Sequence, residues 1–224
     1  IDIGTFEKPL YYYWQAFWSE DPMVHIAVNL KEKDKFRWRG YDVASHWNFN
    51  SEDVDTVFVY SNTEKVELFQ NGKSLGKKDV NPDTYQAIYI VDYKKGSLKA
   101  DAYNGRKKVA THTLKTAKDP EKLVLNDVSV SDPKVEERLV FLTLEVQDKK
   151  GTRCPDARNE VTVEVSGDGE LIGLDSGDQF SHELYKQHVR KAYQGRLLLT
   201  IRPTGDGPIT VNCTADGLDS GSIN

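Results

Sequence analysis

The chain opens with an aromatic segment at helical spacing and then changes, after Pro22, to the two-residue alternation of β-strands. Large apolar side chains recur at helical intervals from Lys8 to Trp18, which predicts a helix over these residues. The helix ends before Pro22, since the residue preceding a proline avoids the α region. It is apolar around most of its circumference, whereas a surface helix needs one apolar stripe. We therefore expect the helix to pack against something outside this chain.

Short strands separated by turn residues are predicted over the rest of the chain. Asn71-Gly72 predicts a two-residue hairpin because both positions tolerate positive φ, and Asn104-Gly105 predicts a second one. Residues 31–50 lack clean periodicity, and we expect a long loop there. The first predicted set of strands covers residues 23–28, 56–60, 66–70, 73–76, 85–93, 97–103 and 107–114. The second set covers residues 122–130, 139–148, 160–166, 170–174, 196–202 and 209–215.

The two sets of strands indicate two domains. The short polar segment Thr116–Pro120 separates them, and its proline favours a semi-rigid linker. A chain of 224 residues is long enough for two units that each bury a core. No strand alternates with a long helix, which argues against a parallel α/β sheet. The predicted fold is all-β, with two tandem immunoglobulin-like β-sandwiches over residues 21–117 and 118–224.

Composition narrows the choice of partners and compartments. The net charge of −5 argues against a nucleic-acid partner. We find no secretory leader and no apolar stretch long enough to span a membrane. The chain starts at Ile1 and not at Met, and we expect it to be a piece of a longer protein. Cys154 and Cys213 fit no metal or redox motif; Cys213 is expected in a core, and a disulfide between the two is left open.

No catalytic or metal-binding motif stands out. The five histidines lie in no nucleophile context, and the spacing of His182 and His188 matches no standard zinc site. The glycine-rich stretches near Gly167 and Gly177 lack the setting of a phosphate or calcium loop, which favours tight turns. We therefore predict no catalytic residue, no metal and no cofactor in this chain.

Aromatic residues near the start of the chain form the one site-like feature. All four tryptophans lie within the first 47 residues. Trp38 and Trp47 fall in the predicted loop, together with Tyr41 and Phe49, and are our candidate substrate-binding residues, at a rim or an interface. Exposed aromatic clusters mark interfaces and can stack on sugars. The alternative, given equal weight, is that these side chains close the end of the first sandwich.

Several segments resemble glycoside hydrolase family 2, and specifically the β-galactosidase-like members just past their catalytic barrel. In the first half the matching segments are Tyr12–Trp18, Pro22–Ile26, His46–Phe49, Val59–Asn62, Val66–Gly76, Ala102–Arg106 and Leu114–Ala117. In the second half they are Cys154–Ala157, Val165–Gly169 and Arg190–Gly195. The resemblance covers nearly the whole chain, and its longest segment, Val66–Gly76, is the most specific.

The resemblance implies that residues 1–20 are a helical stub left from a preceding catalytic domain. Two glutamates of that barrel perform retaining hydrolysis in the family. Both would precede Ile1, so no catalytic residue is carried onto this sequence. The implied partners are the chain's own upstream barrel and the carbohydrate substrate of the parent enzyme, and homo-oligomerisation is a role that such modules can have. The family also implies a periplasmic or extracellular location.

Three functions remain in competition. The first, which we favour, is a non-catalytic accessory region that supports the barrel and the active-site rim of a β-galactosidase-like enzyme. The second is a pair of carbohydrate-binding modules, and the third is an adhesive surface protein of immunoglobulin-like repeats. The first predicts no hydrolysis by the chain alone, whereas the second predicts that Trp38 or Trp47 is exposed to sugars.

Overall fold

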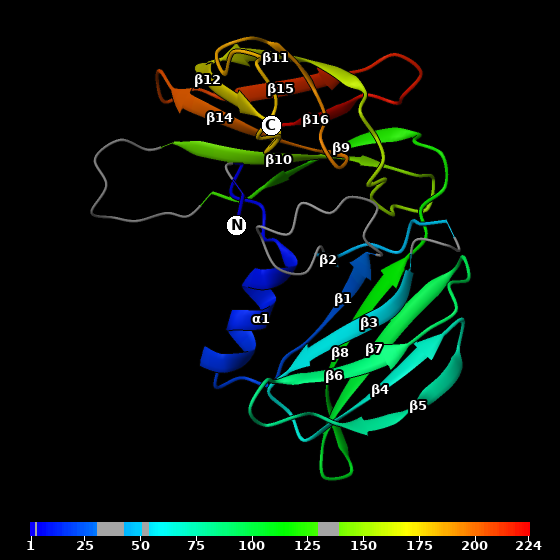
Figure 1. Ribbon diagram of the computed structural model, residues 1–224. Coiled ribbons are helices and arrows are strands. Elements are labelled where there is room, and N and C mark those ends of the chain that lie inside the picture. The colour runs from blue at the N-terminus through cyan, green and yellow to red at the C-terminus, as the bar shows by residue number, and fades with distance from the viewer. Residues whose placement is uncertain (3, 31–42, 51–53, 130–138) are drawn as a thin grey trace. The chain divides into compact units, whose positions relative to one another are not determined.

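The structure, a computed structural model, describes residues 1–2, 4–30, 43–50, 54–129 and 139–224 (Figure 1). The chain divides into two compact units. One comprises Glu7–Thr116, and the other comprises Ala117–Asn224 together with Ile1–Phe6. The sequence assigned residues 1–20 to one segment; in the structure their first six residues belong with the second sandwich and the remainder with the first. The two units divide between Thr116 and Ala117.

The first unit is a sandwich of two antiparallel four-stranded sheets (Figure 1). One sheet has the order β2 (Val43–Ala44), β1 (Val24–Leu30), β3 (Val54–Ser61) and β6 (Gln86–Ile90). The other has the order β5 (Lys73–Asp79), β4 (Lys65–Gln70), β7 (Ser97–Asn104) and β8 (Lys107–Lys115). Inward side chains of both sheets, among them Ile26 and Leu68, form one core.

The second unit repeats this architecture. One sheet has the order β12 (Gly169–Asp175), β14 (Arg196–Pro203), β10 (Val140–Gln147) and β9 (Lys122–Asp127). The other has the order β13 (Val189–Lys191), β11 (Glu160–Gly167), β15 (Ile209–Thr214) and β16 (Gly221–Ile223). Alternating residues of β10, such as Leu142 and Leu144, enter a core that also contains both cysteines. The predicted all-β fold of two sandwiches with a short N-terminal helix is confirmed.

Turn chemistry sets the register of the hairpin between β4 and β5. Asn71 and Gly72 have φ values of 52° and 80°, as a two-residue hairpin turn of this kind requires. The Asn71 side chain also accepts from the Ser97 amide (2.7 Å) and donates to the Lys95 carbonyl (3.0 Å). The turn is thereby attached to the start of β7 in the same sheet.

The linker is held by a buried carboxylate of the second sandwich. Asp148 accepts hydrogen bonds from the backbone amides of Lys118, Lys150 and Thr152, each at 2.9 Å. The Cys154 thiol lies 3.4 Å from the Lys118 carbonyl. These contacts fix the backbone at Lys118 to the second sandwich.

Within the described residues the one helix is α1 (Pro9–Trp18). Proline at the first helical position suits a site whose amide has no partner within the helix. Across the described part of the chain, no helix combines the length and the apolar character that crossing a bilayer requires.

Candidate functional site

The helix α1 packs on the outer face of the sheet that contains β1 and β3. Ala16 is fully buried there, and Tyr12 and Tyr13 pack against Ala27 and Phe58. Phe58 points away from the sandwich core because it alternates along β3 with the core residues Val57 and Val59. One side of the helix is therefore packed against the sheet of the first unit.

The opposite side of α1 is apolar and exposed. Leu10, Trp14 and Trp18 follow one another at intervals of four residues, and Tyr11 flanks them. Trp18 is 77% exposed, and the ring centroids of Trp14 and Trp18 lie 5.6 Å apart with 17° between their planes. We call these four residues the helix face. Large apolar side chains gathered on one exposed stripe mark an interaction surface.

The strand β6 extends the exposed apolar surface of the same sheet side. Ile88 pairs with Phe58 across the sheet, so both side chains leave the sheet on the face that α1 covers. Ile88 and Ile90 are nevertheless 49% and 78% exposed. The helix therefore covers β1 and β3 but leaves β6 open.

An aromatic stack joins α1 to both sheets of the first sandwich. The rings of Tyr12 and His25 are nearly parallel with centroids 3.7 Å apart, and His112 stacks on the other side of His25 at 4.3 Å. His112 Nδ1 accepts a hydrogen bond from the Ile26 amide (2.9 Å), and His25 Nε2 lies 2.8 Å from Ser45 Oγ. A protonated Nδ1 is unable to accept, so this geometry requires neutral His112.

The electrostatics of the stack agree with its geometry. Burial, and secondarily the neighbouring His112, lower the pKa of His25 to about 2. Burial lowers the pKa of His112 to about 4. Burial, and then Tyr13, raise the pKa of Tyr60, the cross-strand partner of His25, to about 12. The stack is thus uncharged at neutral pH, and it packs α1 against the first sandwich.

Of the two tryptophans proposed to contact substrate, the described part of the structure includes Trp47. Trp47 is fully buried in the core of the first sandwich. Its indole N–H donates to the Lys94 carbonyl (3.0 Å), and its own carbonyl accepts from the hydroxyls of Thr116 (2.6 Å) and Tyr93 (3.2 Å). Trp47 therefore offers no ring face to a sugar, which for this residue favours the alternative that it closes the end of the sandwich. Trp38 lies outside the described residues.

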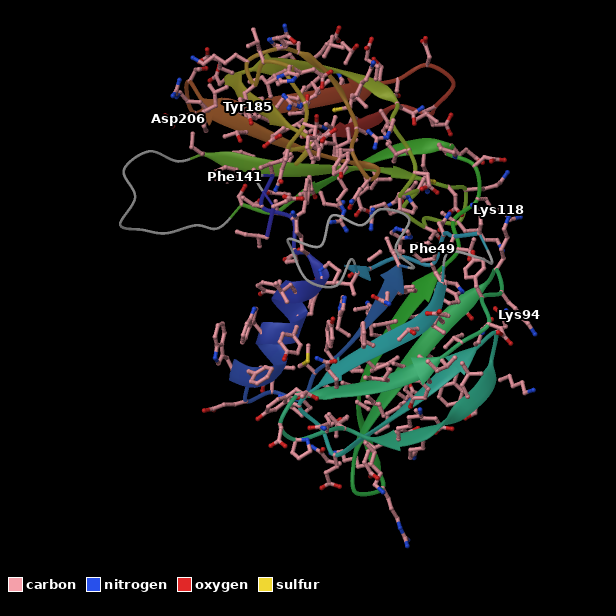
Figure 2. All side chains as sticks on the ribbon, viewed as in Figure 1. Phe49, Lys94, Lys118, Phe141, Tyr185 and Asp206 are labelled. Atoms are coloured by element: carbon pink, nitrogen blue, oxygen red, sulfur yellow. The ribbon has the colours of Figure 1, made fainter. Side chains whose placement is uncertain are left out.

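Phe49 and Lys94, which Figure 2 labels, both lie close to Trp47 in the first sandwich. The rings of Phe49 and Tyr93 lie edge to face at 6.1 Å, and Trp47 packs on Tyr93 at 4.8 Å. Trp47, Tyr93 and Phe49 therefore form one aromatic cluster, which we call the aromatic plug. It contains Trp47, one of the predicted substrate-binding residues.

In the second sandwich a buried arginine organises the loop that contains the predicted turn around Gly177. Arg190 is 1% exposed; its guanidinium lies 3.6 Å from Asp175 and donates to the Glu183 carbonyl (3.3 Å). Asp175 also accepts from the amides of Ser176 and Gly177. Within the described residues no three His, Cys, Asp or Glu side chains are grouped to hold a metal.

Both cysteines lie in the core of the second sandwich. Cys154 and Cys213 are free and buried, and burial raises their pKa values to about 11 and about 12. The thiols are therefore protonated at neutral pH and pack as small apolar side chains, which confirms the expectation for Cys213.

Comparison with known families agrees with the fold. Residues 133–224 match the family described as glycoside hydrolase family 2 C-terminal domain 5. Residues 52–110 match a family described only as a domain of unknown function.

The chain resembles parts of larger proteins. It is 32% identical over 223 residues to the β-galactosidase BoGH2A of Bacteroides ovatus, a match that covers 97% of this chain and 24% of that protein. It is 31% identical over 182 residues to a putative β-glucuronidase of Formosa agariphila, covering 80% of this chain and 16% of that protein. The chain therefore spans about a quarter or less of the length of these relatives.

Solved structures show the same likeness. A glycosyl hydrolase family 2 member from Bacteroides cellulosilyticus matches with a TM-score of 0.87 and 33% identity, over 100% of this chain and 31% of that one. A β-glycosidase from Bacteroides vulgatus matches with a TM-score of 0.85 and 26% identity, over 100% of this chain and 27% of that one. The chain belongs to glycoside hydrolase family 2, within the C-terminal β-sandwich region of that family.

Proposed function

We propose that this chain is a non-catalytic accessory region of a β-galactosidase-like or β-glucuronidase-like enzyme, and that it supports a catalytic barrel in the same polypeptide. The names of the relatives support the glycosidase class. The small fraction of each relative that the chain covers supports the existence of further domains in the parent protein.

The observation that carries the proposal is the exposed helix face. Trp18 alone exposes 77% of its surface, roughly 150 Å² for a side chain of this size. Covering that area stabilises a complex by about 4 kcal/mol before the entropy of docking is subtracted. Tyr11 and Trp14 add to this term. Covering the helix face with an apolar partner surface therefore contributes favourably to docking of the first sandwich.

The direction of the helix face is what a supporting role requires. The same helix is fixed to β1 and β3 through Tyr12, Tyr13 and Ala16. A partner domain that packs on the outer side of α1 is therefore held by the sandwich and not by a loop. Sites on rigid elements hold geometry better than sites on loops.

The test compares two double variants of the full-length protein. Trp14→Ser with Trp18→Ser removes the helix face, and the matched control, Phe180→Ser with Leu184→Ser, removes two exposed apolar residues of the second sandwich. Activity on nitrophenyl β-galactoside and β-glucuronide is measured after incubation at rising temperature. We expect the helix-face variant to lose activity at a temperature several degrees lower, and the control to follow the wild type.

An unchanged inactivation temperature in the helix-face variant contradicts the proposal. Sugar-dependent quenching of tryptophan fluorescence in the 224-residue chain, abolished by the same double substitution, favours carbohydrate binding by α1 in place of docking. The two outcomes are distinct because docking requires no sugar.

A further inference from the structure

The helix α1 covers part of the sheet on which it packs. That sheet has four strands in the order β2, β1, β3 and β6 (Figure 1). Neighbouring strands are about 4.8 Å apart, so a helix about 10 Å in diameter covers two of them. The helix packs against Ala27 of β1 and Phe58 of β3. A second helix is therefore needed to cover the strand β6.

The side of β6 that faces the helix layer is apolar and exposed. Ile88 and Ile90 alternate along β6 with the core residues Ala87 and Tyr89, so both point away from the core. They are 49% and 78% exposed. Two aliphatic side chains thus form an apolar floor beside α1.

The side chains of α1 contact the sheet in order around the helix. Tyr12, Tyr13 and Phe17 lie at about 0°, 100° and 140° around the helix axis, because a helix has 3.6 residues per turn. The centroids of their partner rings lie 3.7, 5.3 and 4.4 Å away and belong to β1, to β3 and to the residue directly before β6, namely His25, Tyr60 and Tyr85. Moving around the helix from Tyr12 to Phe17 therefore moves across the sheet towards β6.

The next positions around the helix form an apolar wall beside that floor. Leu10 and Trp14 lie at about 160° and 200° on the same scale, so they follow Phe17 on the flank nearest β6. They are 56% and 44% exposed. We call Leu10, Trp14, Ile88 and Ile90 the α1–β6 corner.

We propose that an α-helix from the part of the full-length polypeptide that precedes this chain packs alongside α1 and over β6. The inference rests on the proposed function, which places further domains in the same protein. The family matched by residues 133–224 is described as a C-terminal domain, and this chain covers 24% of BoGH2A. Most of such a protein therefore lies on the N-terminal side of this region.

The corner fits a helix better than a strand. β6 is an edge strand, and the Lys78 ammonium donates to the Ile88 carbonyl (2.7 Å). A lysine at a sheet edge discourages pairing with another strand. Ile88 and Ile90 are about 7 Å apart along β6, close to the roughly 6 Å between residues four apart on a helix. Consecutive turns of a helix parallel to β6 therefore contact both side chains.

The size of the corner favours a partner in the same polypeptide over a second copy of the chain. Its four side chains expose roughly 400 Å², about half of what one partner buries in a stable interface between separate proteins. A small surface is sufficient when the partner is covalently attached, because its effective concentration is high.

The first experiment replaces residue 88 or residue 90 of the full-length protein with the photo-crosslinker p-benzoylphenylalanine. The crosslinked peptides are identified by mass spectrometry, and position 73, exposed on the opposite sheet, serves as the control. We expect positions 88 and 90 to crosslink to one upstream segment at residues three to five apart, and the control to miss that segment. Crosslinks to a second copy, crosslinks at residues two apart, or no crosslinks overturn the proposal.

The second experiment measures the inactivation temperature of full-length variants. Ile88→Thr with Ile90→Thr keeps β-branched side chains but makes the floor polar, and the matched control is Val128→Thr with Val189→Thr on exposed residues of the second sandwich. We expect the test variant to lose activity at a temperature several degrees lower and the control to follow the wild type. In the 224-residue chain the test pair should leave the thermal midpoint unchanged, since both side chains are exposed there.

An unchanged inactivation temperature, an equal shift in the control, or an equal loss of stability in the 224-residue chain overturns the proposal. The result is separable from that of the proposed function. Earlier inactivation of the variant Trp14→Ser with Trp18→Ser, together with wild-type behaviour of the Ile88 and Ile90 variant, supports the accessory role and refutes a helix over β6.

Discussion

The buried pair His25 and His112 makes the stability of the first sandwich depend on pH in a range where few other groups titrate. In the unfolded chain both imidazoles have the ordinary pKa of 6.5, whereas in the fold their pKa values are about 2 and about 4. Between pH 6.5 and pH 4 the unfolded state binds more protons than the folded state. The contribution of the two histidines to the free energy of unfolding is therefore fully present above pH 6.5 and is lost as the pH falls.

The size of the effect follows from these values. Lowering the pH from 8 to 5.5 costs about 1.4 kcal/mol for each histidine, and about 3 kcal/mol for the two together. Carboxylates contribute little above pH 5.5 because their unfolded pKa values lie near 4. The loss is a large part of the stability of a typical domain.

Urea unfolding followed by tryptophan fluorescence measures this loss in the first sandwich alone. All four tryptophans precede residue 48, and the second unit has none beyond Ala117. His25→Phe keeps an aromatic ring between Tyr12 and His112 but removes one titrating group, so we expect it to halve the pH dependence. The control His182→Gln, in the second sandwich, leaves it unchanged. A free energy of unfolding that is flat from pH 8 to 5.5 refutes the reasoning.

Three further substitutions test packing, charge and turn geometry. Trp47→Ala removes the largest fully buried side chain and should destabilise the first sandwich by about 3 to 5 kcal/mol in urea unfolding; near-normal stability would show that the aromatic plug is dispensable. Arg190→Ala leaves Asp175 without its buried partner and should lower the stability of the second sandwich by about 3 kcal/mol. Thermal circular dichroism should show this loss without a shift in the tryptophan transition, and a shift in both would contradict it. Gly72→Ala places a side chain at φ of 80° with no atom within 4 Å, so strain alone should cost about 1 kcal/mol; an unchanged urea midpoint would exclude that strain.

The sequence predicted those parts of the fold that local chemistry determines. The strand pair around Asn71-Gly72 could be predicted because the turn residues and the alternation of apolar and polar residues both indicate a hairpin there. The hairpin predicted at Asn104-Gly105 turns one residue later, through Gly105 and Arg106, since Asn104 still pairs with Lys107. The strands β2, β13 and β16 were missed because two or three residues are too few to show a period.

Long-range contacts were beyond sequence reasoning. Trp47 is buried by partners 46 to 69 residues away, and no local pattern separates that outcome from an exposed loop tryptophan. The association of Ile1–Phe6 with the second sandwich depends on close approach to Gly177 and on the Phe6 ring beneath Arg196. The local sequence gives no indication that the Arg190 side chain is buried, because its burial depends on a loop that folds over it.

The predicted helix is present as α1, Pro9–Trp18. Its all-round apolar surface predicted a partner outside this chain, whereas one side of the helix packs on the sheet of β1 and β3 within the chain. The side of α1 that contains Trp14 and Trp18 remains exposed within this chain. This exposed apolar surface is the feature of the helix sequence on which the proposed support of a barrel rests.

The central claim is that this region lacks catalytic activity of its own and belongs to a glycosidase. The most direct measurement is turnover of nitrophenyl β-galactoside and nitrophenyl β-glucuronide by the purified 224-residue chain beside the full-length protein at equal concentration. We predict hydrolysis of at least one substrate by the full-length protein and none by the chain alone. Measurable turnover by the 224-residue chain would contradict the account.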